Sequence, residues 1–313
     1  MKKITSALLV LAMATGAFAQ TKLDKNFTGV KEIRIKLVSG DCRISKAQGQ
    51  TVSVNLQHTY TDNFEPEMSQ TGDNLTLKEL FGSGSSHGSS SWTVQIPDGV
   101  SVVFSSASGS LSASGVAFDL DARSGSGGIT LENVKGDVKG TTGSGDIELT
   151  NYAGEIQANT GSGTIQIYRS KGELSVSSGS GDVRIRDSQA KFLANSGSGT
   201  VHSRGISLEG DSRFSSGSGD SEILLASSPK YNIAVNSGSG DAALDFGGNK
   251  IEGEIVMKAS KAHGTIKAPF EFDRTEEISH GRNDVVVEKT VVKGNANVKI
   301  AVGTGSGEAS IKE

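Results

Sequence analysis

Residues 141–173 read TTGSGDIELTNYAGEIQANTGSGTIQIYRSKGE, and the phrase TGSG at Thr142 returns eighteen residues later at Thr160. The same (S/T)GSG phrase, with one degenerate SASG copy at the start, begins at Ser106, Ser124, Thr142, Thr160, Ser178, Ser196, Ser216 and Ser237, and a last copy begins at Thr304. From Ser106 to Ser237 the intervals are 18, 18, 18, 18, 18, 20 and 21 residues. Five equal intervals in succession indicate a repeat architecture rather than a flexible glycine-serine linker.

Apolar residues occupy fixed positions within this period. Five residues after the first residue of each (S/T)GSG phrase stand Leu111, Ile129, Ile147, Ile165, Val183 and Val201. Two residues further on, their periods carry apolar residues such as Leu149 and Ile167. Past a second turn come Ile156 and Leu174. Apolar positions two apart, with polar residues between them, are typical of strands with one buried face. Each period is therefore predicted to contain two short strands and two turns.

The predicted fold is all-β: a right-handed parallel β-solenoid (β-helix) with about 18 residues and two short strands per coil. Burying about four apolar side chains cannot offset the entropy of fixing eighteen residues, so a coil is expected to be stable only when stacked on others. The GSG glycines are expected to adopt backbone angles closed to other residues. We expect the Ser and Thr hydroxyls of these turns to bond to the turn backbone.

Two periods are longer than the rest, and their extra residues fall at the second turn. The insertions lie in ISLEGDSRF, residues 206–214, and LASSPKYNI, residues 225–233. The GSG turn remains intact in both, so the second corner tolerates loops and the first does not. If the rod has a ligand-binding edge, we expect it along the second corner.

The chain divides into four predicted segments. Residues 1–19 are predicted to be a signal peptide, because Lys2 and Lys3 precede a short apolar run (residues 8–14) and the small residues of Ala17-Phe18-Ala19. Residues 20–97 are predicted to form divergent coils or a cap, residues 98–260 the regular repeats, and residues 261–313 divergent coils and a second cap. The protein is expected to be exported to the periplasm, the outer cell surface or the medium. The apolar run is too short to span a bilayer, and no later segment is expected to do so.

Composition narrows the functional classes. The chain has 31 Lys and Arg against 35 Asp and Glu, a net charge of −4, which gives no electrostatic signature for nucleic acid. The single cysteine, Cys42, stands in SGDCRI where other periods carry Ile or Val, so it is interpreted as a small buried hydrophobe. A reactive thiol is the alternative.

Aspartates follow four of the GSG turns, and their chemistry has two interpretations. Asp146, Asp182, Asp220 and Asp241 suggest a calcium-binding roll, but such rolls place aspartate in both turns of a coil. Asp146 and Asp182 are two coils, or about 9–10 Å, apart, whereas a calcium ion needs its ligands within about 2.6 Å. We therefore interpret these residues as turn-forming and expect no cofactor.

Catalysis is an alternative for such a chain, because enzymes that cut acidic polysaccharides occur on parallel β-helices. The five histidines are scattered, and no metal-binding or nucleophile motif appears. We therefore expect no enzymatic activity.

Two other kinds of solenoid are disfavoured by the sequence pattern. A left-handed hexapeptide helix needs an apolar position every six residues, and an ice-binding solenoid needs regular threonine rows.

Both flanks of the repeat carry a resemblance to a known family. VQIPDGVSVVFSSASGS (residues 94–110), the SGSGDI-type repeats, VKEIRIKLVSGDCRI (30–44) and GNANVKIAVGTGSGEASI (294–311) resemble the bacterial "putative adhesin" family of β-strand-repeat proteins, related to auto-transporter adhesin head domains. The resemblance implies a β-solenoid without established catalytic residues.

These observations lead to one principal functional prediction. The chain is expected to be a non-enzymatic adhesion, scaffold or envelope-sensing module that displays a repetitive polar surface to an extended partner of the envelope or the exterior. A carbohydrate-binding or polysaccharide-degrading β-helix protein is the alternative.

Overall fold

The computed structural model describes residues 21–279, 285–294 and 297–313, and these residues form 29 strands and no helix. The prediction of an all-β chain is therefore confirmed. In the described ranges, no apolar helix of membrane-spanning length is found. The predicted signal peptide, residues 1–19, lies outside the described residues.

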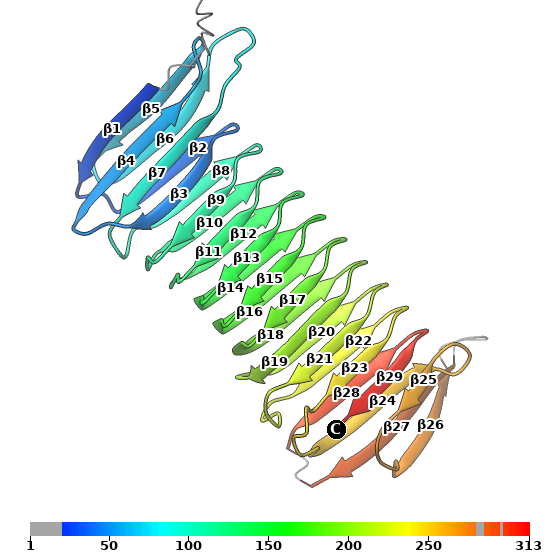
Figure 1. The fold of residues 1–313 in the computed structure, drawn as a ribbon. Helices are drawn as coiled ribbons and strands as arrows, with labels where there is room; N and C mark the ends of the chain where they lie inside the picture. The colour runs from blue at the N-terminus through cyan, green and yellow to red at the C-terminus, as the bar shows by residue number, and fades with distance from the viewer. Residues whose placement is uncertain (1–20, 280–284, 295–296) are drawn as a thin grey trace, which may run out of the picture.

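Successive strands of the repeats alternate between two largely parallel sheets, which stack along an elongated molecule (Figure 1). Sheet A contains, in spatial order, β1 (Thr21–Thr28), β4 (Thr51–His58), β7 (Ser90–Ile96), β3 (Asp41–Lys46), β9 (Leu111–Ser114), β11 (Ile129–Glu132), β13 (Ile147–Thr150), β15 (Ile165–Tyr168), β17 (Val183–Arg186), β19 (Val201–Leu208), β21 (Ser221–Leu225), β23 (Ala242–Asp245), β29 (Glu308–Lys312) and β25 (Thr265–Lys267). Sheet B contains β5 (Phe64–Thr71), β6 (Asn74–Phe81), β2 (Glu32–Leu37), β8 (Ser101–Ser106), β10 (Asp119–Ser124), β12 (Val138–Thr142), β14 (Ala153–Thr160), β16 (Lys171–Ser178), β18 (Gln189–Ser196), β20 (Ser212–Ser216), β22 (Ile233–Ser237), β28 (Lys299–Thr304), β24 (Gly253–Ser260), β27 (Val285–Lys293) and β26 (Arg274–Ser279).

Residues one period apart lie in register on neighbouring parallel strands. In sheet A, Ile129 pairs with Ile147 and Ile147 with Ile165, and the inner row Leu111, Ile129, Ile147, Ile165, Val183 and Val201 is at most 1% exposed. Leu149 and Ile167 form a second buried row in this sheet, and Ile156 and Leu174 are in register in sheet B. The hydrophobic core is thus a stack of side chains enclosed between the two sheets.

The glycines of the GSG turns serve a different purpose from the one expected, because none of them has a positive φ. They are required by the close approach of successive coils. A Cβ on Gly145 would lie 2.3 Å from the carbonyl oxygen of Gly127, and one on Gly163 would lie 2.0 Å from that of Gly145. The prediction of special backbone angles at this corner is therefore wrong, and steric exclusion between coils is the physical reason for glycine.

The first hydroxyl residue of each GSG turn ties its own turn to the preceding coil. Thr142 is buried, its Oγ1 donates to the Gly127 carbonyl at 3.0 Å, and the same oxygen accepts the Gly145 N–H at 3.0 Å. Thr160 repeats both bonds with Gly145 and Gly163. The expected bonds from the hydroxyls to the turn backbone are therefore present, with an added bond between coils.

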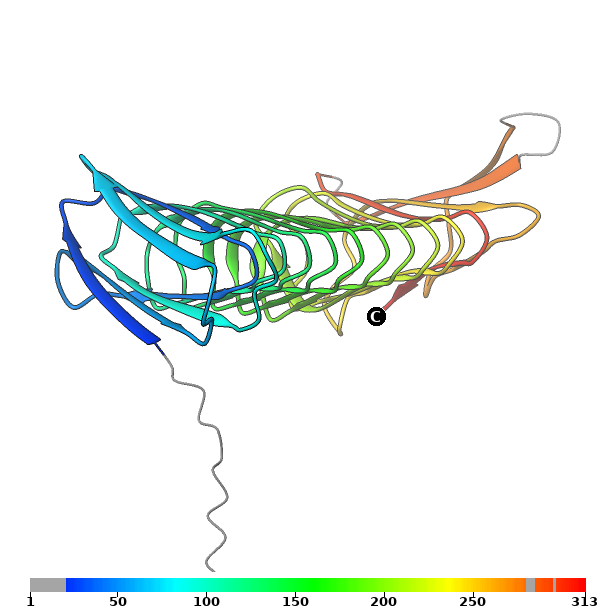
Figure 2. The same cartoon turned by 90° about the horizontal axis from the view of Figure 1, so that it is seen from above.

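Both ends of the rod insert a coil out of sequence order. The coil β2–β3 lies between β6–β7 and β8–β9, and the coil β28–β29 lies between β22–β23 and β24–β25 (Figure 1). Antiparallel strands cover the outer coils: β1 and β4 with β5 at one end, and β27 with β26 at the other. The hairpin β26–β27 extends away from the coil axis in Figure 2. The first and last coils of the sequence are therefore held on both sides.

A buried carboxylate replaces the turn hydroxyl near the N-terminal end. Glu79 is 5% exposed and accepts backbone N–H groups from Val38 at 2.7 Å, Ser39 at 3.2 Å and Gly40 at 3.3 Å. The indole N–H of Trp92 donates to its other oxygen at 3.1 Å, and the Ser90 hydroxyl also donates to that oxygen. Five donors satisfy this carboxylate without a cation among its partners.

Candidate binding surface

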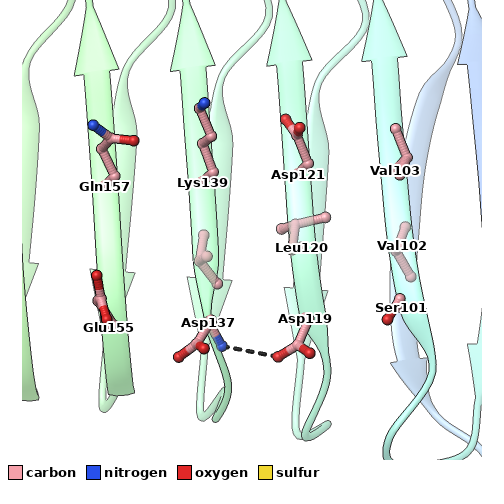
Figure 3. A pocket seen from close by; sticks show the side chains of 11 residues that line it. Ser101, Val102, Val103, Asp119, Leu120, Asp121, Asp137, Lys139, Glu155 and Gln157 are labelled. Atoms are coloured by element: carbon pink, nitrogen blue, oxygen red, sulfur yellow. Dashed lines mark hydrogen bonds between the residues drawn. The ribbon is translucent and has the colours of Figure 1, made fainter.

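Outward-facing side chains form rows along the rod because the strands that carry them are in register. On sheet B one such row contains Ser101, Asp119, Asp137, Glu155, Glu173 and Lys191. Figure 3 shows the first four of these residues side by side on successive strands, along one border of an open surface depression that also includes Asp121 and Lys139. The repeat thus converts each outward position of the period into a line of chemical groups about 4.8 Å apart.

The backbone beside the acidic part of this row is hydrogen-bonded to the buried Tyr152. The Asp137 N–H donates to Asp119 Oδ1 at 3.1 Å (Figure 3). The hydroxyl of buried Tyr152 lies 2.7 and 2.5 Å from the carbonyl oxygens of Gly136 and Glu155, which share its one proton. Burial raises the pKa of the Tyr152 hydroxyl, and the carboxylates of Asp137, Glu155 and Asp119 raise it further. This tyrosine is a neutral hydrogen-bond donor that fixes the backbone of two coils.

The turn aspartates of the first corner make bonds between coils. Asp146 Oδ1 accepts the N–H of Thr164 at 2.7 Å, and Asp182 Oδ1 accepts that of Thr200 at 2.9 Å. Asp220 Oδ1 and Asp241 Oδ1 do the same for Asp241 and Glu308, at 2.8 and 2.7 Å. Each of these carboxylates therefore receives a backbone donor from the next coil, which is a structural use of the side chain.

A metal site needs clustered ligands, and a reactive thiol needs an accessible sulfur. Within the described ranges, no group of three or more His, Cys, Asp or Glu side chains has the geometry to hold a metal ion. His202 Nδ1 lies 3.0 Å from Glu222 Oε2 on the outside of sheet A. Cys42 is 1% exposed and in register with Leu111, and burial raises the pKa of its thiol, which favours the interpretation as a packed side chain.

The second corner contains residues that the apolar pattern did not reveal. Asn133, Asn151, Arg169 and Asp187 follow one another at the 18-residue interval, and all have φ between 48° and 55°. Asn151 Nδ2 donates to Asn133 Oδ1 at 2.9 Å, and Arg169 Nε donates to Asn151 Oδ1 at 2.8 Å. Asparagine tolerates left-handed angles, so two asparagines at this interval were a readable signal for the turn.

Basic residues gather beside this corner. Arg186 and Arg204 are exposed and in register on β17 and β19, with Tyr168 in register on the other side of Arg186. The Arg186 guanidinium lies over the Tyr168 ring, 6.0 Å from its centroid. Arg169 and Lys171 continue around the corner and are also exposed. We call Arg169, Lys171, Arg186 and Arg204 the basic corner.

The fold and these rows define a class: an all-β repeat protein with largely parallel strands, a continuous apolar interior and chemically repetitive outer faces. Within that class the chain belongs to the Toastrack DUF4097 family, whose model matches residues 79–271 and 173–312. This match confirms the family resemblance seen in the sequence.

Solved structures with low sequence identity resemble the chain over most of its length. A "putative cell adhesion protein" from Clostridium sporogenes is 13% identical with a TM-score of 0.22, covering 94% of this chain and 99% of that chain. A "putative adhesin" from Bacteroides fragilis is 13% identical with a TM-score of 0.31, covering 94% and 98%. A "putative lipid binding protein" from Parabacteroides distasonis is 14% identical with a TM-score of 0.29, covering 94% and 97%. A comparison with curated proteins gives no match.

Proposed function

We propose that the chain is an exported, non-enzymatic, right-handed β-solenoid that acts as an adhesion, scaffold or envelope-sensing module. The observation that carries this proposal is the set of in-register polar rows on the outside of both sheets. A rod with such rows can make many weak contacts with an extended partner, and these contacts add through effective concentration. The right-handed winding is supported by the general preference of parallel strand connections.

Export rests on the sequence of residues 1–19 and has its own test. The basic residues, the short apolar run and Ala17-Phe18-Ala19 together favour cleavage before Gln20. Cell fractionation followed by N-terminal mass spectrometry of the native protein is expected to find the chain outside the cytoplasm and beginning at Gln20. A cytoplasmic chain that retains residues 1–19 contradicts the proposal.

Multivalent display can be tested by shortening the rod by whole periods. Deleting residues 124–141, or separately residues 142–159, removes 18 residues and leaves the inner rows aligned, because each position is replaced by its equivalent from the next coil. Each mature chain is then mixed with an envelope preparation from the source cells, and the fraction that co-sediments is measured.

Additive weak contacts predict that both deletions lower retention to a similar, partial extent. If both deletions leave retention at the wild-type level, the distributed mechanism is refuted. If one deletion abolishes retention and the other has no effect, a single local site is responsible instead. Circular dichroism of each variant provides the control for folding.

A further inference from the structure

The four cations of the basic corner are exposed and form no ion pairs within the described structure, and two of them, Arg186 and Arg204, are in register. Within the described residues, none of Arg169, Lys171, Arg186 and Arg204 lies in salt-bridge contact with a carboxylate, whereas neighbouring cations do. Arg184 pairs with Asp182 at 2.6 Å, and Lys191 pairs with Glu173 at 2.6 Å. Asp187 directly follows Arg186 in sequence and occupies the same turn position as Arg169, one coil further on.

The arrangement of Arg186 and Arg204 has a cost for the fold. They occupy directly paired positions on adjacent strands, and like charges in such positions destabilise a sheet. The Tyr168 ring under Arg186 holds one guanidinium in place on the outer face. Unpaired, exposed, in-register cations are explained more readily by a ligand than by folding.

We infer that the basic corner binds an anionic polysaccharide whose carboxylates lie along the rod axis. This inference rests on the proposed function, to which it adds one partner and one local contact surface beside the distributed rows. Guanidinium groups bind planar carboxylates with two parallel hydrogen bonds, and parallel strands place the two arginine backbones about 4.8 Å apart. The position also agrees with the second corner, where the sequence admits insertions just beyond Arg204.

A linear polymer fits this surface better than an anionic membrane does. Asp119, Asp137 and Glu155 lie on sheet B just beyond the same corner, and the whole chain has a net charge of −4. A charged bilayer would act on these carboxylates as well, since its field extends over roughly 8–10 Å at physiological salt. A flexible polymer can follow the arginines from coil to coil without approaching the acidic row.

Binding of the mature chain to polygalacturonate, measured by isothermal titration calorimetry, tests the inference. Neutral dextran of similar length and vesicles containing anionic phospholipid are the comparison ligands. The wild type is expected to bind polygalacturonate, to bind it less tightly as salt is raised, and to bind neither comparison ligand. The double variant Arg186→Gln/Arg204→Gln is expected to lose affinity by about tenfold or more.

The matched control is Arg43→Gln/Arg213→Gln, which removes two exposed arginines that also have no ion pair in the described structure. It changes the net charge equally and is expected to stay within about twofold of wild type. Melting curves check folding, and the arginine double variant is expected to melt no lower than wild type because a like-charge pair is removed.

Three outcomes overturn the inference: no binding of polygalacturonate by the wild type, equal losses in the two double variants, or binding of the vesicles in preference to the polymer. The co-sedimentation experiment separates this failure from that of the proposed function. If the arginine double variant retains full binding to envelope material, the module still acts as proposed but through another surface.

Discussion

Two Gly→Ala substitutions in one coil are expected to change stability in opposite directions. Gly140 is buried in the middle of β12, in register with Ala122 and Ala158. A Cβ there would lie 3.5 Å from Ile129 Cδ1, which is an ordinary contact. Gly140→Ala is expected to stabilise the fold by about 1–2 kcal/mol, from reduced backbone entropy in the unfolded chain and one buried methyl group.

Gly145→Ala introduces the same methyl group five residues later, against the neighbouring coil. The new Cβ would lie 2.3 Å from the Gly127 carbonyl oxygen and 2.5 Å from its carbon, so the two coils must separate. That carbonyl accepts the Thr142 hydroxyl, and losing this bond leaves buried polar atoms unsatisfied. After the gain in unfolded-state entropy is subtracted, a net loss of about 1–3 kcal/mol is expected.

Chemical unfolding of the mature chain, followed by circular dichroism, measures both effects as shifts of the urea midpoint in opposite directions. Gly145→Asn separates the steric explanation from a conformational one. Asparagine accepts left-handed backbone angles but carries a Cβ, so it is expected to be no better tolerated than alanine. A wild-type midpoint for Gly145→Ala, or clear rescue by Gly145→Asn, refutes steric exclusion between coils.

Three further substitutions test individual contacts. Arg169→Asn places a residue that tolerates φ near +48° beside Asn151 and is expected to raise the free energy of unfolding by about 0.5–1 kcal/mol, seen as a higher urea midpoint; a lower midpoint contradicts the strain. Ser203→Ala removes a fully buried hydroxyl that has no hydrogen-bond partner among the described residues and is expected to stabilise by about 1 kcal/mol in the same assay, whereas a loss of stability shows that the hydroxyl is satisfied. Tyr152→Phe is expected to cost about 1 kcal/mol of stability at neutral pH. The raised pKa keeps the Tyr152 hydroxyl protonated in the folded chain, whereas it ionises near pH 10 in the unfolded chain. Above that pH the stability of the wild type is therefore expected to fall more steeply than that of Tyr152→Phe, by up to about 1.4 kcal/mol per pH unit. A constant difference between Tyr152→Phe and wild type from pH 8 to 11 contradicts this last expectation.

The interior of the rod could be predicted from the sequence because its information is local and periodic. Ile129, Ile147 and Ile165 stand at one interval, and that interval is the register of the parallel strands. The second corner was readable in the same way, since Asn133 and Asn151 mark the left-handed position. Apolar periodicity alone overlooked them, because it reports burial and not backbone conformation.

Features that join distant segments were not readable. Glu79 takes its donors from residues 38–40 and from Trp92, and no local pattern links these segments. The insertion of β28–β29 between β22–β23 and β24–β25 likewise leaves no trace in sequence order, because its turn carries the same GSG phrase as any other coil. The sequence also could not show why the GSG phrase needs glycine, because close approach between coils and unusual backbone angles both favour this residue.

A row that repeats without change cannot mark one place on the rod, because every coil then offers the same groups as its neighbours. Local recognition needs a departure from the repeat that leaves the inner rows intact. Tyr168 and Arg186 lie in periods of unchanged length, and the first lengthened loop follows Arg204. The outward residues of these coils can therefore differ without disturbing a turn or a core contact. The inner rows therefore determine the fold, and the few outer positions where the repeat changes determine the choice of partner.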